Sequence, residues 1–250
     1  MKTVFLSDRG KVRPHNEDCA GVFQNLDGDI LAIVADGMGG HRAGDVASSM
    51  TIQLFHDYWK QTYNMDTPKK MESWLRSHVH IINERLYKYA ESHEECQGMG
   101  TTIVAALCTS QFVTIGHIGD SRCYILSEDE LSLVTEDHSL VNELVRHGEI
   151  TKEDAESHPK KNVLLRALGT EQTVDLDVKT LVLEQGDQML LCSDGLSNKV
   201  SHEQLKHILH ADGEIEKKGE QLIQLANDGG GEDNITLVIV HYTDSSDGSR

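Results

Sequence analysis

Short apolar and β-branched runs recur in both halves of the chain, separated by turn-forming residues, and they predict β-strands. The expected strands cover residues 3–6, 20–24, 30–35, 101–108, 111–118, 122–126, 174–183, 188–193 and 234–242. The turn sequence NLDGD separates the second and third runs, which predicts a hairpin. Only a few residues separate the three runs between 101 and 126, so these runs predict an antiparallel meander.

Apolar residues spaced by three and four positions predict helices between the groups of strands. One helix begins at Ala43, and its apolar face is expected to contain Val46, Met50, Leu54 and Tyr58. Other helices are expected from about residue 69 and over 139–148, 151–157, 201–210 and 214–227. The polar segment 139–170 lies between strands, which predicts a surface flap. Without a repeat or a flexible linker, one domain over residues 1–243 with a short tail at 244–250 is the simplest interpretation.

The charge balance limits the classes of partner. The chain has 41 acidic and 23 basic residues and a net charge of −18, which argues against binding to nucleic acid or to an anionic membrane. Its five cysteines show no CxxC spacing, as expected of buried thiols in a reduced protein. No apolar stretch is long enough to cross a bilayer. The composition therefore predicts a soluble cytoplasmic protein.

The stretch ILAIVADGMGGH, residues 30–41, joins an apolar strand to an acid, three glycines and a histidine. An apolar run of this kind is typical of a strand buried on both faces. Asp-Gly is a frequent turn dipeptide, so a turn is expected at Asp36 and Gly37. The glycines would also let the backbone approach a ligand closely. Taken alone, the stretch is better explained as a simple turn than as a binding site.

Five aspartates occur where predicted strands begin or end. Asp36 and Asp194 end their strands, whereas Asp18, Asp120 and Asp233 precede theirs. In an antiparallel sheet the end of one strand lies beside the start of its neighbour, so these acids are expected on one rim. Clustered carboxylates repel each other and favour a hard divalent cation such as Mg²⁺ or Mn²⁺. Any single acid could equally cap a helix or close a turn, but five at strand ends weaken that explanation.

The same region supplies groups suited to phosphoryl chemistry. Two metal ions close together can acidify a water for in-line attack on phosphorus. The planar guanidinium of Arg13 can hold phosphoryl oxygens through paired hydrogen bonds. His41 follows Asp36 on the same loop and can act as a general acid for the leaving alkoxide. Taken singly, Arg13 and His41 are more often exposed surface residues, and the 14 histidines show no zinc-binding HExxH spacing.

Six motifs in this order resemble those of the metal-dependent Ser/Thr protein phosphatases, the PPM or type 2C class. They are RPHNED, VADGMGGH, MGTT, GHIGDSR, LLCSDGL and GGEDNIT. The resemblance extends over essentially the whole chain and is closest to the compact bacterial members that oppose Ser/Thr kinases. It implies an α+β fold, a four-layer αββα sandwich in which two antiparallel β-sheets are flanked by helix pairs.

The resemblance also implies a role for each site residue. Asp36 would bridge two metal ions, either Mn²⁺ or Mg²⁺, and Gly37 would offer its carbonyl to one of them. Asp194 and Asp233 would bind the other ion. Glu17 and Asp18 would hold metal-bound waters, and Asp120 together with Asp194 would bind a third metal ion. Arg13 would bind the phosphate, and His41 would act as the general acid. Asn234 would lie beside the last ligand.

The implied activity is hydrolysis of phosphoserine and phosphothreonine in proteins, by direct attack of a hydroxide bound to two metal ions. The partners would be a bacterial Ser/Thr kinase and that kinase's substrates, and the protein is expected to act as a monomer. In the flap, Lys160, Lys161 and Arg166 would offset the acidic surface toward phosphopeptides. A phosphatase of anti-sigma-factor antagonists is a narrower alternative, and a metal-binding regulator without catalysis is an alternative from another class.

A serine hydrolase is the remaining alternative. It would use Ser121 as the nucleophile with Asp137 and His138 as its partners. However, GDSR lacks the GxSxG pattern, and an acid and a histidine that are adjacent in sequence do not readily align behind one serine. Ser121 is therefore better explained as a turn residue.

Overall fold

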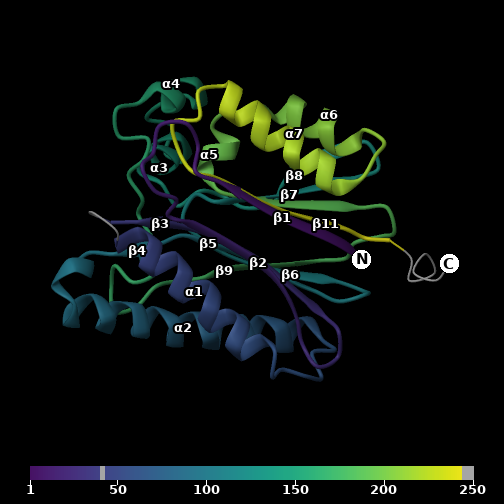
Figure 1. Cartoon of the computed structure of the whole chain (residues 1–250), viewed down its shortest axis with the longest axis horizontal. Helices are drawn as coiled ribbons and strands as arrows, with labels where there is room; N and C mark the ends of the chain where they lie inside the picture. The colour runs from purple at the N-terminus through teal and green to yellow at the C-terminus, as the bar shows by residue number, and fades with distance from the viewer. Residues whose placement is uncertain (40–42, 244–250) are drawn as a thin grey trace.

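The structure, a computed structural model, describes residues 1–39 and 43–243 (Figure 1). Its strands are β1 (Lys2–Asp8), β2 (Asp18–Gln24), β3 (Ile30–Met38), β4 (Gly100–Thr101), β5 (Ile103–Cys108), β6 (Val113–Ile118), β7 (Arg122–Ser127), β8 (Glu130–Leu133), β9 (Asp177–Leu181), β10 (Gln188–Cys192) and β11 (Ile235–His241). Its helices are α1 (Ala43–Trp59), α2 (Pro68–Ser92), the 3₁₀ turn η1 (Glu94–Cys96), α3 (Leu140–Arg146), α4 (Lys152–Ser157), α5 (Asp194–Ser197), α6 (His202–His210) and α7 (Ile215–Asp228).

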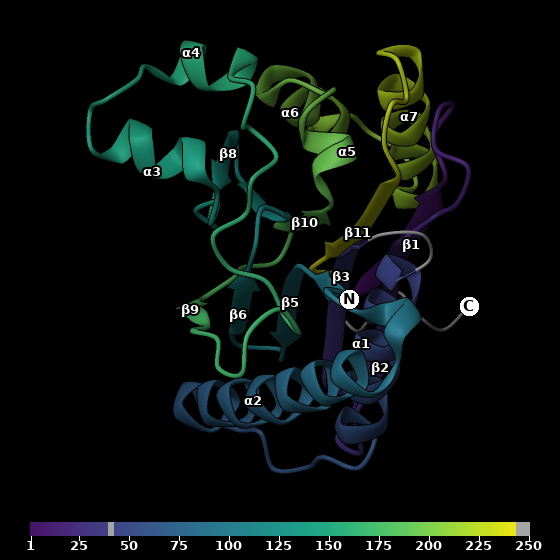
Figure 2. The same cartoon turned by 90° about the vertical axis from the view of Figure 1, so that its left-hand side faces the viewer.

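The described strands form two antiparallel sheets that pack face to face. The β1 sheet has the order β1-β11-β10-β7-β8, and the β2 sheet has the order β2-β3-β5-β6-β9 with β4 paired to β3. Helices α1 and α2 cover the outer face of the β2 sheet, and α5, α6 and α7 cover the β1 sheet (Figures 1 and 2). The predicted αββα sandwich is therefore confirmed.

Three apolar clusters fill the spaces between the four layers. The third strand shows how the sequence builds two of these clusters at once. Leu31 and Ile33 face α1 and α2, whereas Ile30, Ala32 and Val34 face the other sheet. Because both faces are buried, this strand is apolar throughout instead of alternating with polar residues. Among the described residues, no helix has the length and apolar character needed to cross a membrane.

The expected three-strand meander between residues 101 and 126 is wrong. β5 and β6 pair as a hairpin, but β7 belongs to the other sheet, where it lies between β10 and β8. A short connection can join neighbours in one sheet or cross between two stacked sheets, so the spacing alone could not separate these cases. β8 was not expected because it has only four residues, of which three are exposed and two are polar.

The expected turn at Asp36 and Gly37 is also wrong, because β3 continues through both residues. Gly37 pairs with Thr101 of β4, which extends the strand beyond the end of its apolar run. Only glycine fits at this position, because a Cβ on Gly37 would collide with the carbonyl oxygen of Gly44 in the first turn of α1. The glycine therefore allows α1 to begin directly against the end of β3.

The helix predicted from Ala43 is present, but its buried face differs from the expected one. The side chains of Phe55 and Trp59 are fully buried and lie in the cluster against the β2 sheet. The apolar residues expected on this face are only partly buried at its flank: Val46, Met50, Leu54 and Tyr58. Much of the buried face is formed by small or polar residues, namely Ala43, Gly44, Ala47, Ser48 and Thr51. These residues do not stand out as an apolar stripe, which explains why the sequence pattern indicated the neighbouring face.

The segment 139–170 contains α3 and α4, close to the two helices predicted there. The Ser139 hydroxyl accepts a hydrogen bond from the Asn142 N–H at the start of α3, and Thr151 forms a capping box with Asp154 at the start of α4. Both helices lie at one end of the sandwich (Figures 1 and 2). The domain bounds 1–243 and the flap bounds stay predictions, and the predicted tail lies outside the described residues.

His117 of β6 is an ionisable side chain buried between the sheets. It is 2 % exposed, and neither ring nitrogen has a hydrogen-bond partner among the described residues. Burial, together with the neighbouring His138, lowers the pKa of His117 from 6.5 to about 3. Between these two values the unfolded chain binds a proton that the folded protein does not bind. This histidine therefore lowers stability as the pH falls through that range.

We predict that His117→Leu flattens the pH dependence of stability. Below pH 6.5 the free energy of unfolding of the wild type should fall more steeply than that of the variant, by at most one proton or about 1.4 kcal/mol per pH unit. Urea titrations between about pH 7 and pH 5 measure this difference. His80→Leu, on the exposed side of α2, is the matched control. Equal slopes in the wild type and His117→Leu would contradict the prediction.

Candidate metal centre

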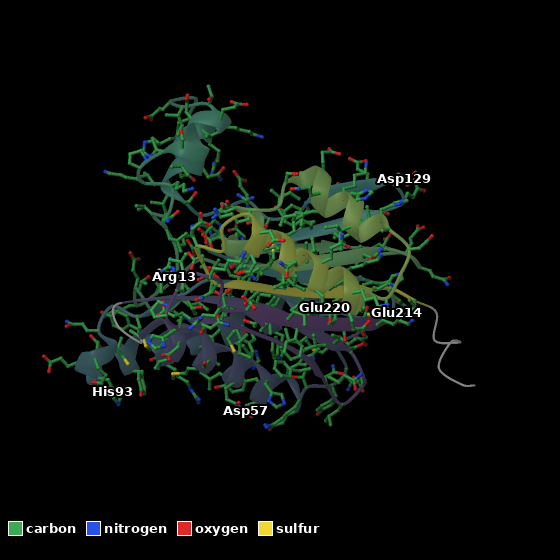
Figure 3. All side chains as sticks on the ribbon, turned by 45° about the horizontal axis from the view of Figure 1, so that its top comes forward. Arg13, Asp57, His93, Asp129, Glu214 and Glu220 are labelled. Atoms are coloured by element: carbon green, nitrogen blue, oxygen red, sulfur yellow. The ribbon has the colours of Figure 1, made fainter. Side chains whose placement is uncertain are left out.

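A cavity of about 200 Å³ gathers acids from distant parts of the chain. Arg13, which lines it, lies at the end of the molecule opposite Asp129 and Glu214 (Figure 3). The lining residues are Arg13, Glu17, Asp36, Gly37, Met38, Gly39, Thr102, Asp120, Asn162, Leu164, Asp194, Asp233 and Asn234. The cavity therefore combines the end of β3 with α5, with loops beside the strands and with residues of the flap.

Four aspartates reach the cavity from the ends of different elements. Asp36 lies near the end of β3, and Asp120 lies in the loop that crosses from β6 to β7. Asp194 is the first residue of α5, directly after β10, and Asp233 precedes β11. β10 and β11 are antiparallel neighbours, which brings the last two acids together. The predicted gathering of acids is thus present, but it is built across two sheets instead of along one rim.

The main chain of Asp36 is held by Thr102, which lines the same cavity. The Thr102 hydroxyl accepts a hydrogen bond from the Asp36 N–H at 3.0 Å, and the Thr102 N–H donates to the Asp36 carbonyl at 2.8 Å. The hydroxyls of Thr102 and Ser121 are 2.7 Å apart and hydrogen-bonded. Because Ser121 follows Asp120, this pair of hydroxyls joins the backbone that carries one acid to the loop that carries another.

Asn234 holds the N-terminal loop against the cavity. Its side-chain amide donates to the carbonyls of Arg9 at 2.8 Å and His15 at 2.9 Å, and its side-chain oxygen accepts from the Glu17 N–H at 2.8 Å. Asn234 is 5 % exposed, so these bonds are shielded from water. The loop that carries Arg13 is therefore fixed by a residue more than two hundred positions away.

Burial is the largest cause of the raised pKa values of the aspartates. It raises the pKa of Asp120 to about 8, of Asp18 to about 7 and of Asp194 to about 6. The pKa of Asp36 is also raised well above its usual value, by burial and then by repulsion from neighbouring aspartates. In each case the ionised form is disfavoured, and a bound cation would offset this cost.

The donor set fits a hard divalent cation. Carboxylate oxygens and the Gly37 carbonyl suit Mg²⁺ or Mn²⁺, and the cluster gathers the negative charge that such an ion would neutralise. Within the described residues, however, no three His, Cys, Asp or Glu side chains converge tightly enough to form a finished ligand set. One reason is that Asp233 accepts a hydrogen bond from the guanidinium of Arg13 at 2.7 Å. Ligand side chains would have to rotate toward an ion.

One of the predicted site residues that the structure describes stands apart from the cavity lining. Asp18 pairs with Asp36 between β2 and β3 but is buried behind it, where its carboxylate accepts a hydrogen bond from the Ser193 hydroxyl at 2.7 Å. His41, the proposed general acid, lies outside the described residues. The structure brings together Arg13, Glu17, Asp36, Gly37, Asp120, Asp194, Asp233 and Asn234.

The arrangement for a serine hydrolase is absent from the described residues. Ser121 is fully buried, and its hydroxyl meets Thr102 instead of a histidine. Asp137 forms a double hydrogen bond with the Arg122 guanidinium, at 2.9 and 2.7 Å. The His138 ring bonds the Gly119 N–H and the Asp177 carboxylate instead of Ser121. Ser121 therefore has neither the base nor the exposure that a nucleophile needs.

Four lining residues were missed by the sequence analysis, which assigned no role to Met38, Thr102, Asn162 or Leu164. Thr102 belongs to the motif MGTT, but threonine is common in strands, and nothing in the sequence shows which main chain its hydroxyl meets. Asn162 and Leu164 lie on the segment that returns from the flap, and their approach to the cavity depends on the tertiary fold.

Comparison with known proteins gives a consistent result. The profile of the family described as Protein phosphatase 2C matches residues 11–230. The serine/threonine phosphatase stp of Listeria welshimeri is 49 % identical over 240 residues, which cover 96 % of this chain and 95 % of that protein. The structure of the serine/threonine phosphatase Stp1 from Staphylococcus aureus is similar, with a TM-score of 0.91 and 39 % identity over 95 % of this chain and 93 % of that one.

The catalytic domain of the serine threonine protein phosphatase PstP in complex with two manganese ions is also similar in structure. It aligns with a TM-score of 0.85 and 36 % identity, covering 97 % of this chain and 98 % of that chain. These similarities extend across the whole sandwich instead of one segment.

We predict that Thr102→Val destabilises the protein by about 1–3 kcal/mol, because it leaves the buried N–H of Asp36 without an acceptor. Thr51→Val is the matched control: the Thr51 hydroxyl is buried without a hydrogen-bond partner among the described residues, so its replacement should be neutral or stabilising. Urea denaturation at constant pH measures both. Equal effects at the two positions would contradict the role given to the Thr102 hydroxyl.

Proposed function

The chain belongs to the protein phosphatase 2C family and is a protein Ser/Thr phosphatase, and from this premise we propose that the acid-lined cavity is its active site. One observation carries the proposal. Five acids from the end of β3, from α5 and from loops beside the strands line a single cavity with one arginine, although they are far apart in the sequence. Such a cavity is suited to hold metal ions and the phosphoryl group of a phosphoprotein next to each other.

Divalent metal ions are the cofactors of this activity, and the similar PstP domain is described in complex with two manganese ions. We propose that Asp36 bridges two Mn²⁺ or Mg²⁺ ions and that the Gly37 carbonyl contributes to one of them. Asp194 and Asp233 would hold the other, and Asp120 with Asp194 would hold a third. When bound, such ions supply positive charge and an acidified water.

The chain's own residues would then orient the substrate and move protons. The guanidinium of Arg13 uses Nη2 for Asp233 and Nε for the carbonyl of Glu232, which leaves further N–H groups for phosphoryl oxygens. We propose that the carboxylate of Glu17, which lines the cavity, accepts hydrogen bonds from metal-bound water. Asp18 stays a proposal for the same role on the grounds of its sequence position alone, since its carboxylate is buried and bonded to Ser193. His41 stays the proposed general acid for the leaving serine or threonine oxygen, on the grounds of its sequence position alone.

The substrates are phosphorylated proteins, and we propose that they include those of a bacterial Ser/Thr kinase and the kinase itself. Lys160 and Lys161 are exposed on the flap and support binding of acidic phosphopeptide segments, whereas Arg166 is paired with Asp177. We further propose a monomer in the cytoplasm. The five cysteines, all within the described residues, are free thiols, which supports a reducing compartment.

We predict that Asp36→Asn lowers kcat for a phosphothreonine peptide and for p-nitrophenyl phosphate by about a hundredfold or more, because the bridging charge is lost. EDTA should abolish the wild-type activity, and added Mn²⁺ should restore it. Asp57→Asn, an exposed aspartate on α1, is the matched control and should retain activity. Full wild-type activity in EDTA would contradict the proposal, as would an active Asp36→Asn enzyme.

A further inference from the structure

The His138 ring lies between the loop that carries Asp120 and strand β9. Its Nδ1 accepts a hydrogen bond from the Gly119 N–H at 3.1 Å, and its Nε2 lies 3.1 Å from a carboxylate oxygen of Asp177. Because Nδ1 accepts a hydrogen bond from the backbone N–H, the neutral ring carries its own proton on Nε2, which donates to Asp177. His138 is 8 % exposed, so the bond from Gly119 is shielded from water, whereas the Asp177 side chain is 57 % exposed.

The main chain of His138 joins the same loop to the far side of the flap. Its N–H donates to the Gly119 carbonyl at 2.8 Å, and its carbonyl accepts from the Leu165 N–H at 2.8 Å. Two residues further along, the Leu140 N–H donates to the Val163 carbonyl at 2.8 Å. The outgoing and returning segments of the flap are therefore paired at their base, with His138 at the start of the pairing.

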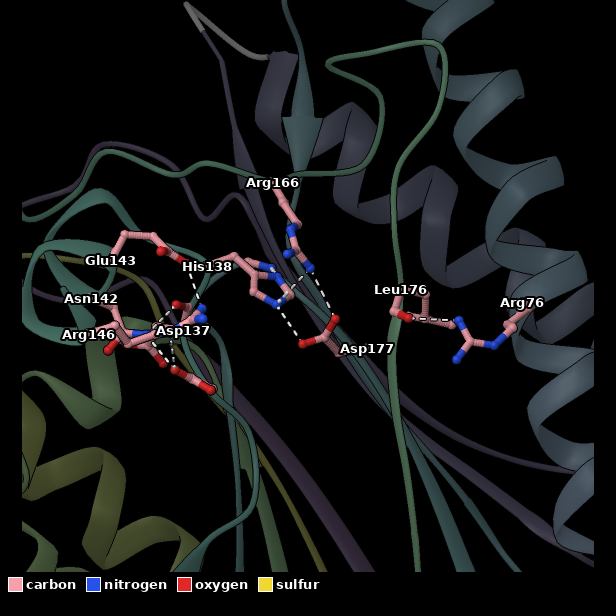
Figure 4. A network of polar contacts seen from close by, with 11 residues as sticks. Arg76, Asp137, His138, Asn142, Glu143, Arg146, Arg166, Leu176 and Asp177 are labelled. Carbon is pink, nitrogen blue, oxygen red and sulfur yellow. Dashed lines mark hydrogen bonds and ion pairs between the residues drawn. The ribbon is translucent and has the colours of Figure 1, made fainter.

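Asp177 closes the network from β9. It accepts a hydrogen bond from His138 through one carboxylate oxygen and from Arg166 Nη1 through the other, at 3.0 Å (Figure 4). His138 precedes the outgoing segment of the flap, and Arg166 lies on the returning segment. A single carboxylate on the β2 sheet thus anchors both ends of the flap.

Two contacts of the His138 ring, which we call its two arms, lead to the proposed active site. The Nδ1 arm is the hydrogen bond from Gly119, and the Nε2 arm is the hydrogen bond to Asp177. Gly119 precedes Asp120, and a Cβ on Gly119 would collide with Thr102, so this loop has little freedom to shift. On the other side, the returning segment anchored at Leu165 carries Leu164, which lines the cavity. His138 itself lies outside the cavity lining.

We propose that His138 is a positioning residue that sets the Asp120 loop and the flap in a fixed relation to each other. The Nδ1 arm holds the loop and therefore the acid proposed for a third metal. The Nε2 arm holds the base of the flap through Asp177 and therefore the wall that a phosphoprotein meets. The inference rests on the proposed function of the cavity, and it assigns separate consequences to the two nitrogens of one ring.

Two substitutions separate the two arms. In His138→Asn the side-chain oxygen can occupy the position of Nδ1 and accept from Gly119, but the side chain is too short to reach Asp177. In His138→Gln the amide can reach Asp177 in place of Nε2, but the acceptor for Gly119 is lost. Each variant therefore removes one arm and retains the other.

For His138→Gln we expect the Mn²⁺ concentration at half-maximal hydrolysis of p-nitrophenyl phosphate to rise about tenfold or more, since supporting residues of this kind change metal affinity by 10–100-fold. Trypsin should cleave the flap, at Lys152, Lys160 or Lys161, as slowly as in the wild type. The flap arm remains intact in this variant.

For His138→Asn we expect the opposite pattern. The Mn²⁺ dependence with p-nitrophenyl phosphate should stay close to that of the wild type. Trypsin should cleave the flap faster, and kcat/KM for a phosphothreonine peptide should fall about tenfold. Asp177→Asn removes the charge that holds Arg166, so it should share this pattern, and it serves as the second variant if His138→Asn does not fold.

His147→Asn is the matched control, because His147 is an exposed histidine on the flap. It should leave the Mn²⁺ dependence, the trypsin cleavage and the peptide kinetics unchanged. Variants of His138 that behave alike, or that behave like the wild type, would overturn the inference. An inactive wild type at saturating Mn²⁺ would instead overturn the proposed function, so the two failures are distinguishable.

Discussion

Repulsion among partly buried carboxylates is the constraint on which the rest of the structure depends. The fold opposes it mainly through the main chain. Asp36 is held by hydrogen bonds between its own backbone and Thr102, and Asn234 fixes the loop of Arg13 through backbone groups. The carboxylates themselves have few fixed partners. Backbone anchoring keeps the acids close together while leaving their side chains available to rotate toward a cation.

The layered fold follows from patterns that the sequence displays directly. Strands buried on both faces, such as β3, are continuous apolar runs, and helices flank them at the expected places. The errors occurred where the same pattern serves two geometries. The short link around Asp120 could have joined strands within one sheet, but it crosses between sheets, and Asp-Gly lies in a strand because α1 packs closely on Gly37.

The acids of the site could be found from the sequence because each lies at or beside the end of an apolar run that forms a strand. The residues that hold them could not be found in this way. The hydrogen bond between the hydroxyls of Thr102 and Ser121 joins two loops, and no local pattern indicates which hydroxyls meet. His138 illustrates the same limit. Its position after Asp137 suggested a catalytic triad, whereas its ring bonds Gly119 and Asp177.

Charge balance connects the cavity to its proposed cofactors. Five carboxylates and one guanidinium line it, from Glu17, Asp36, Asp120, Asp194, Asp233 and Arg13, which is a formal excess of four negative charges. Two divalent cations match that excess, while a single one leaves half of it. Arg13 already bonds to Asp233, so an ion that takes over this carboxylate would free the guanidinium for an incoming phosphoryl group. Metal binding and substrate binding would then support each other through one exchanged hydrogen bond.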